Sequence, residues 1–107
     1  MTQRIYLAGP MTGYRDFNYP AFNAEAARLR QLGYHVENPA ENAVPACGTW
    51  AGYMRLALAQ LVTCETIALL PGWLASRGAN IERALAVDLG MKIVMAADIT
   101  EPARSAA

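Results

Sequence analysis

A strand, a turn and the start of a helix follow one another in the stretch Leu69-Leu70-Pro71-Gly72-Trp73-Leu74-Ala75-Ser76-Arg77-Gly78-Ala79-Asn80-Ile81-Glu82. The apolar run 66–70 predicts a buried strand that Pro71-Gly72 ends, and a helical pattern follows from 79 to 89. Loops between a strand and a helix are where α/β proteins bind anions and sugars. Glu82 falls within about one turn of the predicted helix start, where the helix dipole favours an ionised carboxylate. It is therefore a candidate nucleophile or base; the alternative is that it only complements the helix end.

Short apolar runs alternate with helical patterns along the rest of the chain. We expect further strands at 4–8, 34–37 and 92–95, and helices at 20–32 and 50–62. Thr49 is the candidate N-cap of the second helix, and Gly33 and Gly90 end the first and third. The faces expected to pack inward are Phe22, Ala26, Leu29 and Leu32 on the first helix, Met54, Leu58, Leu61 and Val62 on the second, and Ile81, Leu85 and Leu89 on the third.

This order of elements predicts a single-domain α/β fold, a Rossmann-like or flavodoxin-like three-layer sandwich. Its parallel sheet has about four strands, in the order 2-1-3-4. The switch point then lies between the first and third strands, where ligands bind. It brings the loop 9–13 opposite 71–82, with the loop 38–41 beside them. We expect the domain to span 1–96 and 97–107 to be a short extension or a frayed tail.

Composition excludes several classes of protein. The 107 residues suffice for one core, and the formal net charge of zero lacks the basic face of a nucleic-acid binder. No apolar run approaches the ~20 residues of a membrane span, and no signal segment opens the chain. Two cysteines and one histidine without metal-type spacing predict no metal site and a location in the reducing cytoplasm.

The loop after the first strand is a candidate binding loop. Gly9-Pro10 ends the strand and Gly13 follows, which favours close approach of the backbone to a ligand. The glycine spacing differs from that of dinucleotide-binding folds, so NAD is not expected. His35 is predicted to be a solvated strand residue, and Cys64 a small core residue.

Two segments together carry a family resemblance. One is Ile5-Tyr6-Leu7-Ala8-Gly9-Pro10-Met11-Thr12-Gly13 with Asn18-Tyr19-Pro20-Ala21-Phe22-Asn23, and the other is Leu70-Pro71-Gly72-Trp73 with Ser76-Arg77-Gly78-Ala79 and Glu82. The chain resembles, to about residue 95, a small uncharacterised family of bacterial and phage proteins related to nucleoside 2-deoxyribosyltransferases. It is similar, more distantly, to the deoxynucleoside 5′-monophosphate N-glycosidases.

The resemblance implies a chemistry and a set of site residues. In that superfamily a glutamate attacks the anomeric carbon of a 2-deoxyribose and expels the base, as in retaining glycosidases; here it would be Glu82. Ser76 and backbone N–H groups near Gly78 and Asn80 would hold a 5′-hydroxyl or 5′-phosphate. The expected lining of the base and sugar pocket is Tyr6, Gly9, Pro10, Met11 and Gly13, with Asn38 contacting the base. The resemblance implies no cofactor and a homo-oligomer.

One position departs from the enzymes. They carry an aspartate on the helix before the third strand, eight residues ahead of an acidic residue at that strand's start. Here the later residue is Glu65 and the earlier position is Ala57. Loss of a positioned acid or base costs on the order of 10²–10⁴ in rate. Glu41 and Glu65 are the candidate substitutes, and we favour Glu41 because Glu65 lies at the amino end of its strand.

Four further residues keep two interpretations. Trp73 either stacks on a base or seals its turn, and Arg77 either meets a phosphate or is solvated. Trp50 and Tyr53 are expected to be structural or to face a second subunit.

We therefore expect a protein that binds a deoxynucleoside or its 5′-monophosphate and cleaves or transfers the N-glycosidic bond through Glu82. Its partner is a small molecule, neither a nucleic acid nor a membrane. The alternative is a catalytically weak nucleotide-binding or sensing module, which Ala57 favours. A third hypothesis is a structural or interaction protein that kept the fold.

Overall fold

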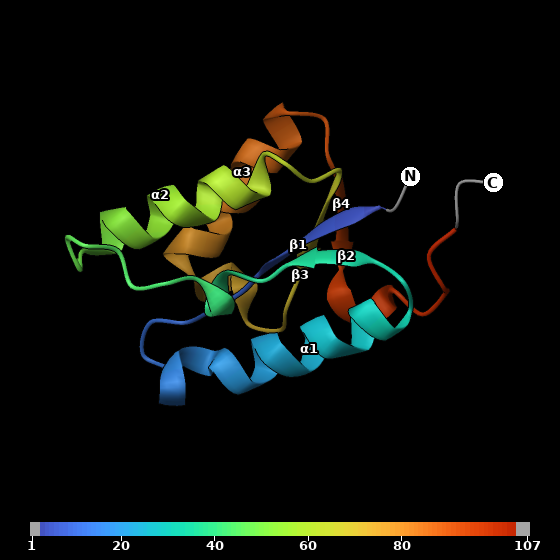
Figure 1. Cartoon of the computed structure of the whole chain (residues 1–107). Helices are drawn as coiled ribbons and strands as arrows, with labels where there is room; N and C mark the ends of the chain where they lie inside the picture. The colour runs from blue at the N-terminus through green and yellow to red at the C-terminus, as the bar shows by residue number, and fades with distance from the viewer. Residues whose placement is uncertain (1–2, 105–107) are drawn as a thin grey trace.

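The computed structural model describes residues 3–104 as one parallel sheet flanked by helices (Figure 1). The strands are β1 (Arg4–Ala8), β2 (His35–Glu37), β3 (Thr66–Leu69) and β4 (Lys92–Met95), and the helices are α1 (Tyr19–Gln31), α2 (Trp50–Leu61) and α3 (Arg77–Asp88). All strand pairs are parallel, and their order is β2-β1-β3-β4. The predicted fold class and strand order are confirmed.

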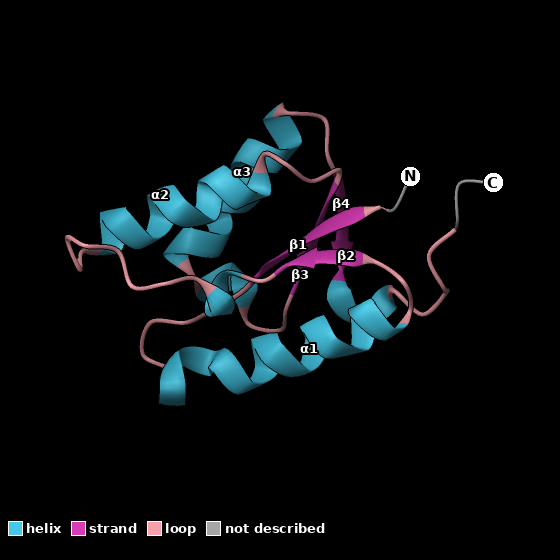
Figure 2. Cartoon of the chain, viewed as in Figure 1, coloured by secondary structure: helices cyan, strands magenta, loops and turns pink. Residues whose placement is uncertain are grey.

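The sheet separates two apolar layers, and side chains alternate between them along β1. Ile5 and Leu7 pack in the layer that α1 covers. Tyr6 and Ala8 pack in the opposite layer, under α2 and α3. Figure 2 shows α1 on one side of the sheet and the other two helices on the opposite side.

The first helix packs as its sequence predicts. Phe22, Ala26 and Leu29 are buried against the sheet, Leu32 is partly buried beside them, and Pro20 lies in the first turn. The second strand starts one residue later than predicted and the third ends one residue earlier.

The inward faces of the other two helices differ from the prediction. Ile81 is 38% exposed and Leu89 is 53% exposed, and Val62, the C-cap of α2, is exposed as well. The buried side chains of α3 are Ala79, Glu82 and Ala86. Small alanines let this helix lie close to the sheet, so longer apolar side chains fall on its flanks.

The segment after β4 is an ordered extension as far as residue 104. A short 3₁₀ turn, η4 (Ala96–Asp98), follows the strand. The Arg28 guanidinium on α1 donates to the carbonyl oxygens of Ala96, at 2.8 Å, and Ile99, at 2.7 Å. The Ala103 N–H donates to the Leu32 carbonyl at 2.7 Å. Of the two predicted alternatives, the short extension describes 97–104, and residues 105–107 lie outside the described part.

Candidate functional site

A cavity of about 810 Å³ opens beyond the carboxyl ends of β1 and β3. Its walls come from the end of β1, the loop after it, the first turns of α2 and the segment that opens α3. The switch point of the sheet is where the strand order predicted a ligand site. Aromatic side chains are prominent in its lining, namely Tyr6, Tyr14, Phe17, Tyr19, Phe22, Trp50 and Tyr53.

Two buried groups meet at the base of this cavity. Glu82, on α3, is 5% exposed, and Tyr6, on β1, is fully buried. The Tyr6 hydroxyl donates a hydrogen bond to Oε2 of Glu82. Strand β1 and helix α3 thus bring together two residues that are 76 positions apart in the sequence.

Burial changes the titration of both groups. It raises the pKa of Glu82 to about 7, and the hydrogen bond from Tyr6 partly offsets this rise by favouring the carboxylate. Burial, followed by the adjacent Glu82 charge, raises the pKa of Tyr6 well above its ordinary value. Tyr6 is therefore a proton-bearing donor at neutral pH, while Glu82 is divided between its two forms.

The position of Glu82 on its helix differs from the prediction. Helix α3 begins at Arg77, two residues earlier than expected, because the Ser76 hydroxyl caps it by accepting from the Ala79 N–H at 3.2 Å. Glu82 therefore lies in the second turn, and the dipole acts mainly within the first. The interpretation of Glu82 as a residue that merely complements the helix end is wrong, since its carboxylate faces Tyr6.

Several predicted binding residues do line the cavity. They are Tyr6, Gly9, Pro10, Met11, Ser76 and Gly78. Glycine at position 9 was expected to let the backbone approach a ligand, but the structure gives another reason for it. A Cβ there would lie 2.8 Å from Cβ of Leu70, so this glycine lets the two switch-point loops pack together.

Gly13, Asn38 and Asn80 are not brought to the cavity wall. Asn38 is buried and holds its own turn, since its Oδ1 accepts from the Ala40 N–H at 3.1 Å. Its Nδ2 donates to Oδ1 of Asn23 at 3.0 Å. Both ends of this side chain are therefore engaged within the protein.

Asn80 holds the loop ahead of α3 instead of facing the cavity. Its Nδ2 donates to the carbonyl oxygens of Leu74 at 2.8 Å and Ser76 at 2.7 Å. The residue thus fixes the conformation of the loop that carries Ser76.

Glu41 does not serve as a substitute acid near Glu82. It is absent from the cavity wall and forms a two-pronged ion pair with Arg30, at 2.7 and 2.8 Å. That pairing lowers the pKa of Glu41. Glu65 lies at the amino end of β3, where its Oε2 accepts from the Arg4 N–H at 2.9 Å. Ala57 is in the cavity wall, and Glu82 is the one carboxylate among the described lining residues.

Helix α2 contributes a wall of the cavity that was not expected from the sequence. Trp50, Tyr53 and Met54 line the cavity together with Ala57. The Arg77 guanidinium stacks over the Trp50 ring, with its carbon 4.1 Å from the ring centroid. The spacing of these residues places them on one face of the helix, and this was the sequence signal that could have predicted the wall. The same spacing also fits a subunit interface, and that interpretation stays a prediction.

Trp73 does not line the cavity. It packs against the core layer beneath α2 and α3, and the Arg83 guanidinium covers its ring at 5.4 Å. The interpretation of this residue as the seal of its turn is favoured over base stacking.

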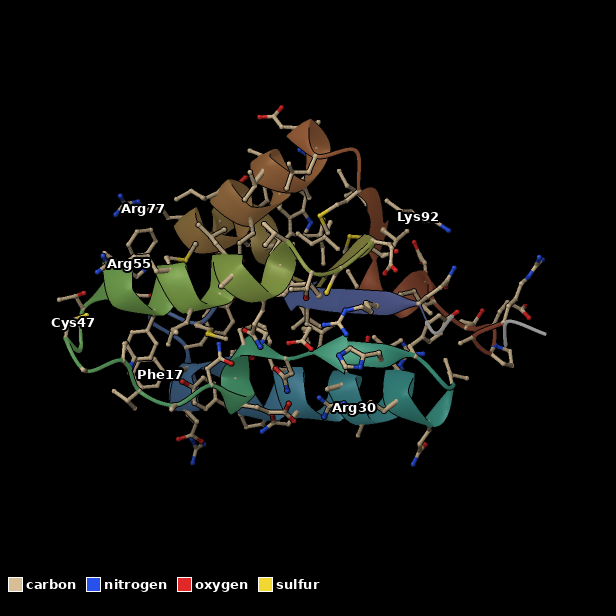
Figure 3. All side chains as sticks on the ribbon, turned by 45° about the horizontal axis from the view of Figure 1, so that its top comes forward. Phe17, Arg30, Cys47, Arg55, Arg77 and Lys92 are labelled. Atoms are coloured by element: carbon tan, nitrogen blue, oxygen red, sulfur yellow. The ribbon has the colours of Figure 1, made fainter. Side chains whose placement is uncertain are left out.

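The mouth of the cavity carries an unusual backbone. Asp16, Phe17 and Asn18 all have positive φ, at 50°, 52° and 61°. The left-handed region costs roughly 1–2 kcal/mol per residue with a side chain. Phe17 lines the cavity and is nevertheless 60% exposed. Figure 3 labels Phe17 and Arg77 toward the same end of the molecule, on either side of α2 in that view.

A second, smaller cleft of about 390 Å³ lies between the amino end of β1 and α2. Its polar groups are engaged with one another: Glu37 accepts from Arg4 at 3.3 Å and from Gln60 at 3.1 Å. His35 contacts the same carboxylate at 2.6 Å and is exposed, in agreement with the predicted solvated residue. Cys64 is buried, as expected. This end of the sheet holds a structural network.

The protein family described as "Domain of unknown function (DUF4406)" matches residues 3–95. The chain belongs to this family. The match ends at the last residue of β4, so in this DUF4406 chain the extension that Arg28 holds follows the matched region. None of the curated proteins matches the sequence. The family description carries no activity, and the resemblance to nucleoside 2-deoxyribosyltransferases stays a prediction.

The chemical character of this DUF4406 site follows from its lining. Glu82 and Arg77 are the charged side chains among the described residues of the wall, and the remainder is aromatic, apolar or neutral. Within residues 3–104, no three His, Cys, Asp or Glu side chains gather as a metal site would require. Across the same residues, no helix is both long enough and apolar enough to cross a bilayer. The aromatic side chains of the wall could contact a planar ring, and Arg77 could bind an anion. The carboxylate of Glu82 could react with an electrophilic carbon of a ligand held in the cavity.

Proposed function

We propose that this protein binds a deoxynucleoside or its 5′-monophosphate and cleaves or transfers the N-glycosidic bond, with Glu82 as the nucleophile. One observation carries the proposal: a buried carboxylate, oriented by the Tyr6 hydroxyl, at the base of an aromatic cavity at the switch point. Such a cavity, with few polar groups aimed at one place, is the usual form of a small-molecule site.

The reaction requires a carboxylate oxygen with a free lone pair. Oε2 of Glu82 accepts from Tyr6, so Oε1 is the atom that attacks C1′. The C1′–O bond forms as the C1′–N bond breaks, and the electron pair of the broken bond goes to the base, which takes a proton from water. Water or a second base then attacks C1′ and releases the carboxylate.

The cavity lining supports this class of ligand. Aromatic side chains offer stacking surfaces for a base. Arg77 offers a cation that is already oriented by Trp50, which suits a 5′-phosphate. Ser76 lies beside it, although its hydroxyl already accepts from the Ala79 N–H.

Base release tests the proposal. Deoxynucleosides and their 5′-monophosphates are incubated with wild type, Glu82→Gln and Glu41→Gln, with and without an added acceptor base, and the free base is quantified. Glu41→Gln is the matched control because its carboxylate lies outside the cavity. We expect release by wild type and the control, and its loss in Glu82→Gln. Release in none of the three, or in all of them, would contradict the proposal.

A binding or sensing module without turnover is the second candidate, and Ala57 favours it. The cavity wall offers no second carboxylate among the described residues, so the leaving base has no positioned acid. Ala57→Asp is expected to raise base release by about 10²-fold or more if the chemistry exists. Ala57→Asn controls for shape without acidity. Tight nucleotide binding with no release by wild type or by Ala57→Asp would favour the module.

The cytoplasmic location and the homo-oligomer remain predictions from the sequence. Size-exclusion chromatography with light scattering would test the second of them.

A further inference from the structure

The segment 14–18 has features that the proposed chemistry does not use. Three consecutive residues with side chains adopt left-handed backbone there, and Phe17 among them is neither glycine nor asparagine. Strained backbone of this kind persists only where the surroundings impose it, and it concentrates at ligand clamps and switch regions.

Contacts at both ends hold this segment over the cavity. The Asn18 side chain donates to the Pro10 carbonyl at 3.0 Å, and the Tyr14 N–H donates to the Met11 carbonyl at 3.1 Å. The Tyr14 hydroxyl lies against Gly72, where a Cβ would come within 2.7 Å of it. The segment is thus fastened to both switch-point loops at its ends.

In the middle of the segment the Phe17 N–H donates to the Tyr14 carbonyl at 3.0 Å, but the Phe17 side chain makes little contact with the protein. Phe17 is largely exposed, and its ring makes a tilted contact with Tyr19, with 6.0 Å between the centroids. An aromatic ring is seldom left this exposed on the wall of a cavity, because burying it is favourable. A planar ligand in the cavity would supply the missing contact surface.

We propose that segment 14–18 is a clamp that closes on the planar ring of the bound ligand, with Phe17 as the residue that contacts it. The proposal rests on the proposed function for the class of ligand, a base attached to a sugar. Closure relaxes the left-handed turn and buries Phe17, and Asn18 and Tyr14 act as the fixed ends.

Calorimetric titration with the four common deoxynucleoside 5′-monophosphates and with 2-deoxyribose 5-phosphate tests the contact. Phe17→Ala is expected to weaken nucleotide binding at least tenfold and to leave binding of the sugar phosphate unchanged, because the sugar phosphate has no planar base to stack on Phe17. Phe17→Trp is expected to keep nucleotide affinity. The control is Val44→Ala, an exposed apolar residue outside the cavity wall. Equal nucleotide affinity of wild type and Phe17→Ala would overturn the clamp.

Asp16→Gly tests the movement. Glycine adopts the left-handed region without cost, so it stabilises the open turn. We expect a higher melting temperature of the free protein together with nucleotide binding weakened several-fold. Loss of affinity in Phe17→Ala with unchanged affinity in Asp16→Gly would show a fixed wall and overturn the closing movement.

The clamp and the proposed function can fail separately. Phe17-dependent nucleotide binding without base release would contradict the chemistry and support the clamp. If no nucleotide binds, the proposed function fails, and the clamp is tested with 8-anilino-1-naphthalenesulfonate, a planar fluorescent probe. Fluorescence enhancement that Phe17→Ala abolishes would support the clamp, and equal enhancement would overturn it.

Discussion

The Tyr6 hydroxyl and the Glu82 carboxylate meet in the wall of the cavity, where both side chains are almost completely buried. Burial raises the pKa of Glu82 to about 7, and the hydrogen bond from Tyr6 opposes that rise. A nucleophile must be ionised, so the fraction of active enzyme is expected to change with pH near neutrality.

The pH dependence of base release follows from this titration. We expect kcat/KM to rise with pH through about 7 and to level above it, as Glu82 loses its proton. Tyr6→Phe removes the hydrogen bond that favours the carboxylate, so its profile should shift to higher pH. Rates measured between pH 5 and 9 check this, and a profile flat across that range would contradict it.

The titration of Glu82 should change stability in the opposite direction, so that stability falls where kcat/KM rises with pH. The folded state holds the Glu82 proton more tightly than the unfolded chain, whose glutamate has a pKa near 4.5. Stability is therefore full below about pH 4.5 and is lost as pH rises toward 7, by up to about 3 kcal/mol for the shift of Glu82.

Glu82→Gln removes this titration. The free energy of unfolding of Glu82→Gln minus that of wild type should therefore be more positive at pH 8 than at pH 5. Urea denaturation of both proteins at the two pH values measures this difference. Glu101→Gln, at an exposed position, is the control. If wild type and Glu82→Gln differ in free energy of unfolding by the same amount at both pH values, the raised pKa of Glu82 is refuted.

The loops after β1 and β3 pack closely against each other at Gly9 and Leu70. Gly9→Ala would place a Cβ 2.8 Å from Cβ of Leu70, a contact that neither backbone can relieve easily. We expect a loss of about 1–3 kcal/mol in the free energy of unfolding. Thr12→Ala, exposed in the same loop, should stay within about 0.5 kcal/mol of wild type. Similar stability of the two variants in urea would argue against this packing.

The elements themselves could be predicted because each carries a local signal. Strand and helix existence, the Thr49 cap and the strand order all follow from periodicity, capping chemistry and the handedness of crossovers. The inward face of α3 could not be predicted from its large apolar residues. The sheet receives Ala79, Glu82 and Ala86, and their fit depends on how closely the helix approaches.

At the scale of the whole molecule, the extension after β4 shares the face of the sheet that α1 covers. Ala96 and Ile99 pack in that core layer, and Arg28 holds both of their carbonyl groups. Arg28→Ala is expected to lower the free energy of unfolding by about 2 kcal/mol, since two charge-assisted hydrogen bonds are lost.

Arg15→Ala, an exposed arginine remote from these carbonyl groups, is the matched control. Urea denaturation of both variants gives the comparison. An Arg28→Ala variant as stable as Arg15→Ala would show that the extension contributes nothing through this contact.

The candidate site could be predicted in part for the same reason as the fold. The loop that starts at Gly9 and the segment that leads to Glu82 were expected there because the loops after the first and third strands meet at the switch point. Tyr6 was implied by the family resemblance alone, and it lies in the cavity wall. The α2 wall, the role of Asn38 within its own turn and the distance of Glu41 from Glu82 could not be predicted. They depend on helix crossing and on ion pairs such as Glu41 with Arg30, which no local pattern contains.

Acid-quenched mass spectrometry during turnover of the deoxynucleotide panel tests most directly whether Glu82 is the nucleophile. We expect a peptide containing Glu82 that is heavier by the sugar transferred to it, present in wild type and absent in Glu82→Gln. Base release with Glu82 unmodified in every quench, together with release that survives Glu82→Gln, would contradict it.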